Sequence, residues 1–289
     1  MIIDIIITGL INGGTYALLA IGFSLIFGVA RIVNIAHTAF YMVASYCLYA
    51  ATFKFGLNPL LGMLFGVAVS TLAGVITYKI FIAPIREHEA VVLIATIALA
   101  MALQETMQLI FTGDYLSVPA LLPGYMTLFG AKVFYQHLLT FFSVLIILGT
   151  LHLFLKKSRL GLAIRSTAQD REVANLMGMN EARVATITVA ISVALAGFTG
   201  AVIAPLTIVE PHMWLHPLIM MMAVVVLGGL GSMKGSFYAA YILGFAEALI
   251  VFLVPMGAFL KGSVALSIMV LVLLVRPEGL CGIAFEEER

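Results

Sequence analysis

Long apolar runs without a charged residue constrain this chain more than any other feature. Residues 5–30, 135–155 and 184–208 contain no Asp, Glu, Lys or Arg, in a chain that is 63% hydrophobic and 10% charged. A helix needs roughly 20 apolar residues to cross the hydrocarbon core of a bilayer. Inside a bilayer each backbone polar group must find a partner within the protein, which favours helices. The sequence therefore predicts an all-α polytopic membrane protein.

Proline, glycine and charged residues divide the chain into apolar segments. The predicted spans are residues 2–30, 33–54, 57–82, 90–112, 135–155, 184–208, 218–233, 236–254 and 261–275. The number falls to eight if the first two segments form one span plus a broken helix. Short connections leave no room for a soluble domain, so residues 1–289 are predicted to form one transmembrane domain. The glycine pairs Gly9/Gly13, Gly62/Gly66 and Gly231/Gly235 have the small-xxx-small spacing that permits close helix contact in lipid.

One internal loop, residues 156–183, concentrates the charge of the chain. It holds nine charged residues in 28 positions, and six of these nine are among the 15 Lys and Arg residues of the whole sequence. Because basic residues are enriched in cytoplasmic loops, this loop is predicted to lie in the cytoplasm. Counting spans outward places the N-terminus on the periplasmic side and the C-terminus in the cytoplasm. The N-terminal segment lacks a basic region and a cleavage site, so it is expected to remain as the first span.

The same loop contains the sequence of a short capped helix. Thr167 is expected to cap it with Asp170 at the third position, and Gly178 is expected to end it after about three turns. Asn180 is expected to cap the next span. A helix this short needs a surface to pack on, and the apolar residues predicted to face the bundle are Ile164, Val173, Leu176 and Met177. Two interpretations remain open: a connector at the membrane surface, or a docking helix for a cytoplasmic motor.

Polar residues within apolar segments are candidates for a transport pathway, since a charge at bilayer depth is costly. Arg31, Asn34 and His37 lie at the junction of the first two segments, with a spacing that could align them on one helix face. They are either pathway residues at a membrane-depth break or part of a cytoplasmic turn. Glu105 and Glu247 are either functional, or hydrogen-bonded between helices, or directed at a subunit interface.

Other motifs give weaker signals. His212 and His216, near Glu210, have a helical metal-ligand spacing, but flanking prolines favour an interfacial loop with Trp214 at the headgroup level, and no metal site is predicted. The stretch from Gly228 to Ser236 is not a phosphate loop, because Lys234 precedes Gly235, and a tight turn is expected there. A net charge of +1 gives no reason to expect nucleic acid.

Four separated blocks give the sequence a family resemblance: residues 12–46, 159–180, 224–249 and 273–282 resemble, in order and spacing, the LivH-type permease of branched-chain amino-acid ABC transporters. Within the second block, EVANLMG is similar to the E-A-A-x-x-x-G coupling motif of bacterial importers, with Val173 in place of the first Ala. The chain departs from the family pattern at His37-Thr38 and at Glu105.

The resemblance implies a type II importer permease. Such a subunit works with a second, paralogous permease, two cytoplasmic ATPases that bind ATP and Mg²⁺, and a periplasmic binding protein, in the bacterial inner membrane. The permease itself would be no enzyme and would hold no cofactor. The residues that would contact the ATPases are Arg165, Gln169, Asp170, Glu172, Ala174, Leu176 and Gly178. The alternative function is an ion-coupled secondary transporter that uses Glu105 or Glu247 and needs no ATPase.

Overall fold

The computed structural model of the chain describes residues 2–128 and 131–281. Seven of its helical segments are long and apolar enough to cross a membrane. They are α1 (Ile2–Ala30), α3 (Pro59–Thr77, continuing to Ile85), α4 (Glu89–Phe111), α5 (Tyr135–Lys157), α8 (Glu181–Ile203, continuing to Leu206), α10 (Met233–Leu253) and α11 (Lys261–Val275) with the turn before it. The fold is thus the helical membrane bundle that the apolar runs predict.

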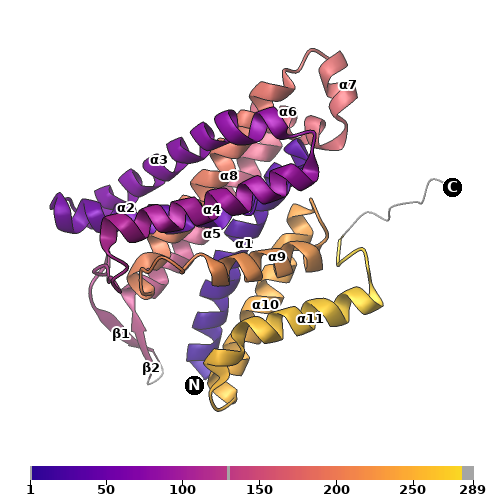
Figure 1. Cartoon of the computed structure of the whole chain (residues 1–289). Coiled ribbons are helices and arrows are strands. Elements are labelled where there is room, and N and C mark those ends of the chain that lie inside the picture. Colours follow the sequence, from indigo (N-terminus) through magenta and orange to yellow (C-terminus); the bar gives the residue numbers. More distant parts are fainter. Residues whose placement is uncertain (1, 129–130, 282–289) are drawn as a thin grey trace.

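The remaining helices are shorter. Two correspond to predicted spans: α2 (His37–Tyr49), which continues as a π-helix to Lys54, and α9 (Leu215–Gly228). The loop after α5 contains α6 (Arg159–Gln169) and α7 (Arg171–Leu176). Figure 1 shows α6 and α7 at one end of the bundle and a β-hairpin at the opposite end. We call these ends the loop face and the hairpin face.

Helix α1 is the central element of the bundle. Every residue from Gly13 to Ile26 is buried, and the helix packs against α5, α8, α9 and α10. Its closest neighbour is α10, where a Cβ atom added to Gly244 would lie 2.6 Å from the Cα of Gly13. The small residues therefore bring the two backbones into direct contact, as predicted for Gly9 and Gly13.

A second close contact joins α2, α3 and α8. A Cβ on Gly66 of α3 would lie 2.6 Å from the carbonyl oxygen of Ala44, and one on Gly200 of α8 would lie 3.0 Å from the Cα of Tyr41. Ser45 Oγ reinforces the contact by donating to the carbonyl oxygens of Tyr41 and Gly200, both at 3.0 Å. The prediction for Gly62/Gly66 is confirmed.

The third predicted glycine pair is wrong. Gly231 does not lie on a helix, because it adopts a left-handed conformation (φ 80°) in the turn before α10, whereas Gly235 packs against the backbone of Gly228. The spacing of Gly231 and Gly235 comes from the tight turn predicted between residues 228 and 236. Gly229 (φ 96°) begins that turn, and Ser232 ends it by accepting a hydrogen bond from the Gly235 amide at 3.1 Å.

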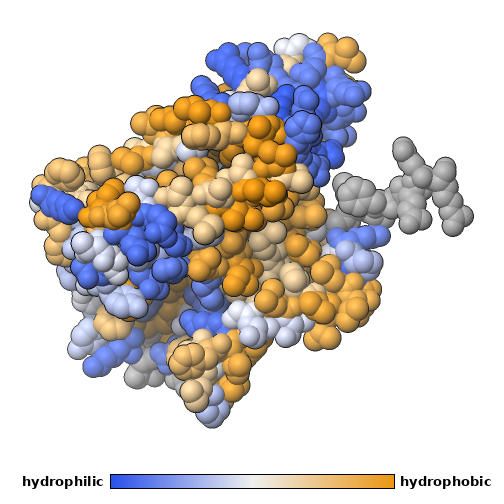
Figure 2. Space-filling model, viewed as in Figure 1, coloured by the Kyte–Doolittle hydropathy of each residue, from blue (hydrophilic) through white to orange (hydrophobic). Residues whose placement is uncertain are grey.

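The outside of the bundle is apolar, as a protein in lipid requires. Figure 2 shows hydrophobic residues over the middle of the molecule and hydrophilic residues gathered at its ends, most densely over α6 and α7. Helices α4 and α11 contribute strongly exposed side chains, such as Leu109 (83%) and Leu274 (78%).

The described part of the chain contains one antiparallel pair of strands, β1 (Tyr125–Leu128) and β2 (Ala131–Phe134). The hairpin lies in the connection between the predicted spans 90–112 and 135–155. Cross-strand contacts stabilise the pair: the rings of Tyr125 and Phe134 lie 6.1 Å apart, and the Lys132 ammonium lies 5.2 Å from the Tyr125 ring centre. Such pairs are the unit of sheet stabilisation.

We predict that Gly244→Val destabilises the bundle by about 1–3 kcal/mol, because the added carbons would meet the backbone of α1, which cannot rotate away as a side chain can. The measurement is the thermal unfolding midpoint of the purified protein in detergent. Gly262→Val is the control, since a Cβ at Gly262 meets nothing within 4 Å. An equal effect of the two changes would show that the contact between α1 and α10 is not tight.

Candidate functional site

The charged loop at the loop face folds as two helices rather than one. Ser158 caps α6 by accepting a hydrogen bond from the Gly161 amide at 2.8 Å, and Asp170 caps α7 by accepting one from the Val173 amide at 3.0 Å. The predicted cap, Thr167, is buried inside α6. Asp170 has an extended backbone that ends α6 and starts α7. The single helix of three turns capped by Thr167 was therefore wrong.

The end of this loop is formed as predicted. Gly178, which follows the C-cap residue Met177, adopts φ +81°, a conformation that favours glycine and ends the helix. Asn180 then caps α8 by accepting a hydrogen bond from the Arg183 amide at 2.9 Å.

The apolar residues of α7 do not face the bundle. Val173, Leu176 and Met177 are 54%, 86% and 76% exposed. Of the four apolar residues predicted to face the bundle, only Ile164 of α6 is buried. The residue of α7 that is buried is Ala174. Helix α6 packs on α1, α5 and α8, whereas α7 is a short helix that contacts α6 and α8. The loop thus presents a surface, defined here as the α7 tip, made of Val173, Leu176 and Met177.

Ionic contacts fix the base of α7 to the bundle. Arg171 donates from Nε to the carbonyl oxygen of Val29 at 3.0 Å, at the end of α1. Its Nη2 lies 3.5 Å from the Glu181 carboxylate, which also lies 3.1 Å from Nη1 of Arg86. Because these side chains are partly exposed, each pair contributes little free energy. Their importance is geometric, since they join the end of α1, the turn between α3 and α4, and the start of α8.

The predicted coupling residues occupy this loop but differ in exposure. Gln169, Asp170 and Glu172 are exposed at the loop face, as is Gly178, whereas Ala174 is buried. Arg165 is also exposed and lines a crevice between α1, α5, α6 and α10. The structure therefore brings these residues into one projecting unit, and their role in ATPase coupling stays a prediction.

The three residues at the junction of α1 and α2 do not share a helix face. Arg31 is exposed and left-handed (φ 54°), and the chain is not helical again until His37. Asn34 and His37 are 2% and 0% exposed. Ser192 Oγ lies 3.4 Å from His37 Nδ1 and donates to the Gly22 carbonyl oxygen at 2.5 Å. The junction thus separates an exposed Arg from two buried polar side chains between α1, α2 and α8.

Glu247 is a buried carboxylate at the centre of a polar cluster whose other members include the partly exposed His216 and Lys261. Its carboxylate is 2% exposed and accepts a hydrogen bond from Tyr16 Oη at 2.5 Å. Lys261 Nζ lies 3.4 Å from it and His216 Nε2 lies 3.8 Å from it. The four residues come from α1, α9, α10 and α11, so the buried carboxylate is hydrogen-bonded between helices.

Glu105 belongs to a different polar cluster. The neighbouring Gln104 donates to Glu105 Oε1 at 3.3 Å, lies 3.4 Å from His212 Nε2, and accepts a hydrogen bond from Trp214 Nε1 at 2.8 Å. Trp214 is 4% exposed, and its indole fills a buried site beside α4; its place at the headgroup level stays a prediction. Sequence reasoning missed Gln104, whose only signal was an amide within an apolar run.

Within residues 2–128 and 131–281, no group of three or more His, Cys, Asp or Glu side chains has the geometry to hold a metal ion. His212 instead contacts Gln104, and His216 contacts Glu247. The two histidines therefore belong to separate polar clusters on α4 and α10.

A bundle with apolar sides and a projecting capped loop at one polar end defines the class as a multi-pass membrane protein. Residues 5–275 match the model of the family described as "Branched-chain amino acid transport system / permease component". The chain belongs to this family of ABC transporter permeases.

The similarity to two bacterial permeases extends over nearly the whole chain. The chain is 31% identical to the high-affinity branched-chain amino acid transport system permease protein BraD of Pseudomonas aeruginosa, over 96% of this chain and 94% of that protein. It is 29% identical to LivH of Escherichia coli K12, over 95% of this chain and 93% of that protein. Among solved structures, PsaBC of Streptococcus pneumoniae in complex with Fab shares the fold, with a TM-score of 0.51 and 14% identity over 94% of this chain and 91% of that chain.

Proposed function

We propose that this chain is the transmembrane subunit of an ABC importer for branched-chain or related amino acids, driven by ATP hydrolysis in separate ATPase subunits. The α7 tip carries the proposal. A short helix that exposes Val173, Leu176 and Met177 at a polar face of the molecule leaves apolar surface for a protein partner to cover. Membership of a transport permease family and the names of its relatives support the amino-acid substrate.

The proposed assembly contains a second, paralogous permease, two ATPases that hold ATP and Mg²⁺, and a periplasmic binding protein. Each ATPase would contact the α6–α7 loop of one permease. The catalytic chemistry of ATP hydrolysis would lie in the ATPases, so this subunit would be no enzyme and would hold no cofactor itself.

The alternative of an ion-coupled transporter draws less support from Glu105 and Glu247, because Glu105 is exposed on α4 and only Glu247 is buried. Glu247 already has Tyr16, Lys261 and His216 as partners, an arrangement that serves to join four helices. An exposed apolar tip at the loop face would have no use in a transporter that works alone.

We predict that uptake in proteoliposomes requires ATP together with the ATPases and the binding protein, and continues when ionophores collapse proton and sodium gradients. The measurement is the accumulation of radiolabelled leucine, with vesicles lacking the ATPases as the control. Uptake by this chain alone, lost when an ion gradient is collapsed, would instead favour the secondary transporter.

We predict that Leu176→Asp abolishes co-purification of the ATPases, because it places a charge in the apolar contact, while the amount of permease in the membrane stays unchanged. Ala182→Asp is the matched control: it adds the same charge to the same loop, but at the first turn of α8, where a carboxylate is favourable. Retention of the ATPases by Leu176→Asp would exclude the α7 tip as the docking surface.

The proposed orientation puts the loop face in the cytoplasm, the N-terminus outside and the C-terminus inside. The Lys and Arg residues of the loop support it. In a variant without Cys47 and Cys281, a membrane-impermeant thiol reagent should label Gln169→Cys only from the cytoplasmic side and Leu122→Cys, near the hairpin, only from the periplasmic side. The reverse pattern would invert the topology.

A further inference from the structure

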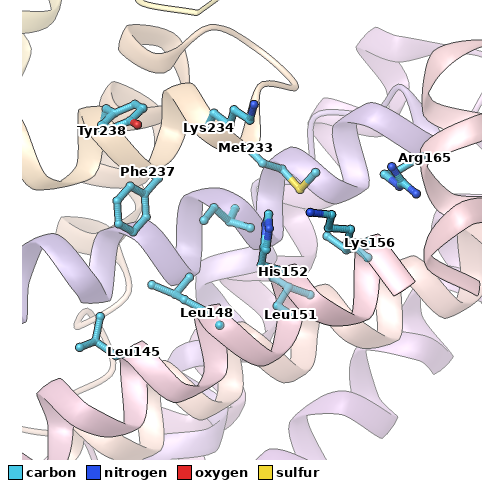
Figure 3. Close-up of a pocket in the computed structure, with 13 residues that line it drawn as sticks. Leu145, Leu148, Leu151, His152, Lys156, Arg165, Met233, Lys234, Phe237 and Tyr238 are labelled. Carbon is cyan, nitrogen blue, oxygen red and sulfur yellow. The ribbon is translucent and has the colours of Figure 1, made fainter. Parts of the chain in front are cut away.

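A crevice of about 740 Å³ opens on the side of the bundle below the α6–α7 loop. Its walls come from α1, α5, α6 and α10, and it lies on elements that do not contain the α7 tip. Figure 3 shows its residues arranged along the crevice by polarity, with basic groups toward one end and apolar side chains toward the other.

The end nearest the loop face is basic. Lys156 of α5, Arg165 of α6 and Lys234 of α10 line it, together with His152. No Asp or Glu is among the described residues that line the crevice. In the part of the chain that the structure describes, no carboxylate forms an ion pair with any of these three cations. Three helices therefore direct positive charge to a place that lacks a counter-ion from the protein.

The other end is apolar and continues along the bundle toward the middle of α5. Leu145 and Leu148 of α5 and Phe237 of α10 line it. Gly149 leaves the wall open between them, since an added Cβ would meet nothing within 4 Å. The long apolar side of the crevice suits an alkyl chain.

We propose that the crevice between α1, α5, α6 and α10 binds an anionic phospholipid, with its phosphate at Lys156, Arg165 and Lys234 and one acyl chain along Leu145, Leu148 and Gly149. Basic pockets between transmembrane helices at the cytoplasmic face are typical sites for anionic headgroups. A general excess of basic residues in cytoplasmic loops accounts for the charges. It does not account for their convergence from three helices on an apolar groove that runs into the span.

Such a lipid would connect the loop to the bundle. Arg165 belongs to α6, whereas Lys156 lies in the last turn of α5 and Lys234 in the first turn of α10. A bound phosphate would therefore be shared by three cations on three separate elements and hold them together.

The test is photo-crosslinking of the purified complex in phosphatidylcholine vesicles. The vesicles contain a trace of a probe lipid with a diazirine in one acyl chain, and the probe is phosphatidylglycerol in one sample and phosphatidylcholine in the other. Mass spectrometry then measures the label on peptides of α5 and α10. We expect the crevice peptides to take up more phosphatidylglycerol than phosphatidylcholine. The preference should fall about fivefold for each of Lys156→Gln and Lys234→Gln, in line with the attraction of one basic residue to an anionic lipid.

Two further variants make the result decisive. Lys157→Gln removes the same charge from the adjacent residue, which does not line the crevice, and should keep the preference. Gly149→Leu fills the apolar end without changing the charge and should reduce labelling by both lipids.

Three outcomes would overturn the proposal. An equal loss with Lys157→Gln would show general surface attraction instead of a site. Loss of the phosphatidylglycerol preference in inorganic phosphate, with undiminished labelling in Gly149→Leu, would show that the basic end takes a free anion and that the labelled lipid lies outside the crevice. Absence of label from the crevice peptides in the assembled complex, with label in the isolated permease, would show that a protein partner occupies the crevice.

Discussion

Close packing of α1 against its neighbours is the contact on which the rest of the structure depends. Because lipid tails are as apolar as the side chains, burying hydrophobic surface gives little drive for helices to associate within a bilayer. Backbone contacts allow dense van der Waals packing instead. Gly244 meets Gly13 between α10 and α1, whereas Gly66 of α3 and Gly200 of α8 each meet the backbone of α2. With α1 buried from Gly13 to Ile26, the bundle and the loop helix α6 are both arranged around it.

Features governed by local rules could be predicted from the sequence. The apolar runs give the spans, Gly178 ends α7, and Asn180 starts α8, because each depends on residues within a few positions. The cap of the loop helix could not be chosen in this way, since Thr167 and Asp170 are both good caps. The prediction that Val173 and Leu176 face the bundle was also wrong. Apolar character alone does not decide whether a side chain packs against its own chain or stays exposed for a partner.

Polar clusters that join distant helices left no pattern in the sequence. Tyr16 and Glu247 are 231 positions apart, and Gln104 and Trp214 are 110 apart. Glu247 could be recognised as unusual because of its apolar surroundings, but its partners could not be named. The basic crevice left no pattern for the same reason, because Lys156 and Lys234 line one crevice only when α5 and α10 both pack against α1.

The carboxylate of Glu181 has a mechanical consequence. It lies within ion-pair distance of both Arg86 and Arg171, and Arg171 also holds the last turn of α1 through the Val29 carbonyl oxygen. A force applied to α7 would therefore be shared among the ends of several helices rather than bending the loop alone. A movement of α7 would therefore be transmitted at once to the end of α1, the turn before α4 and the start of α8.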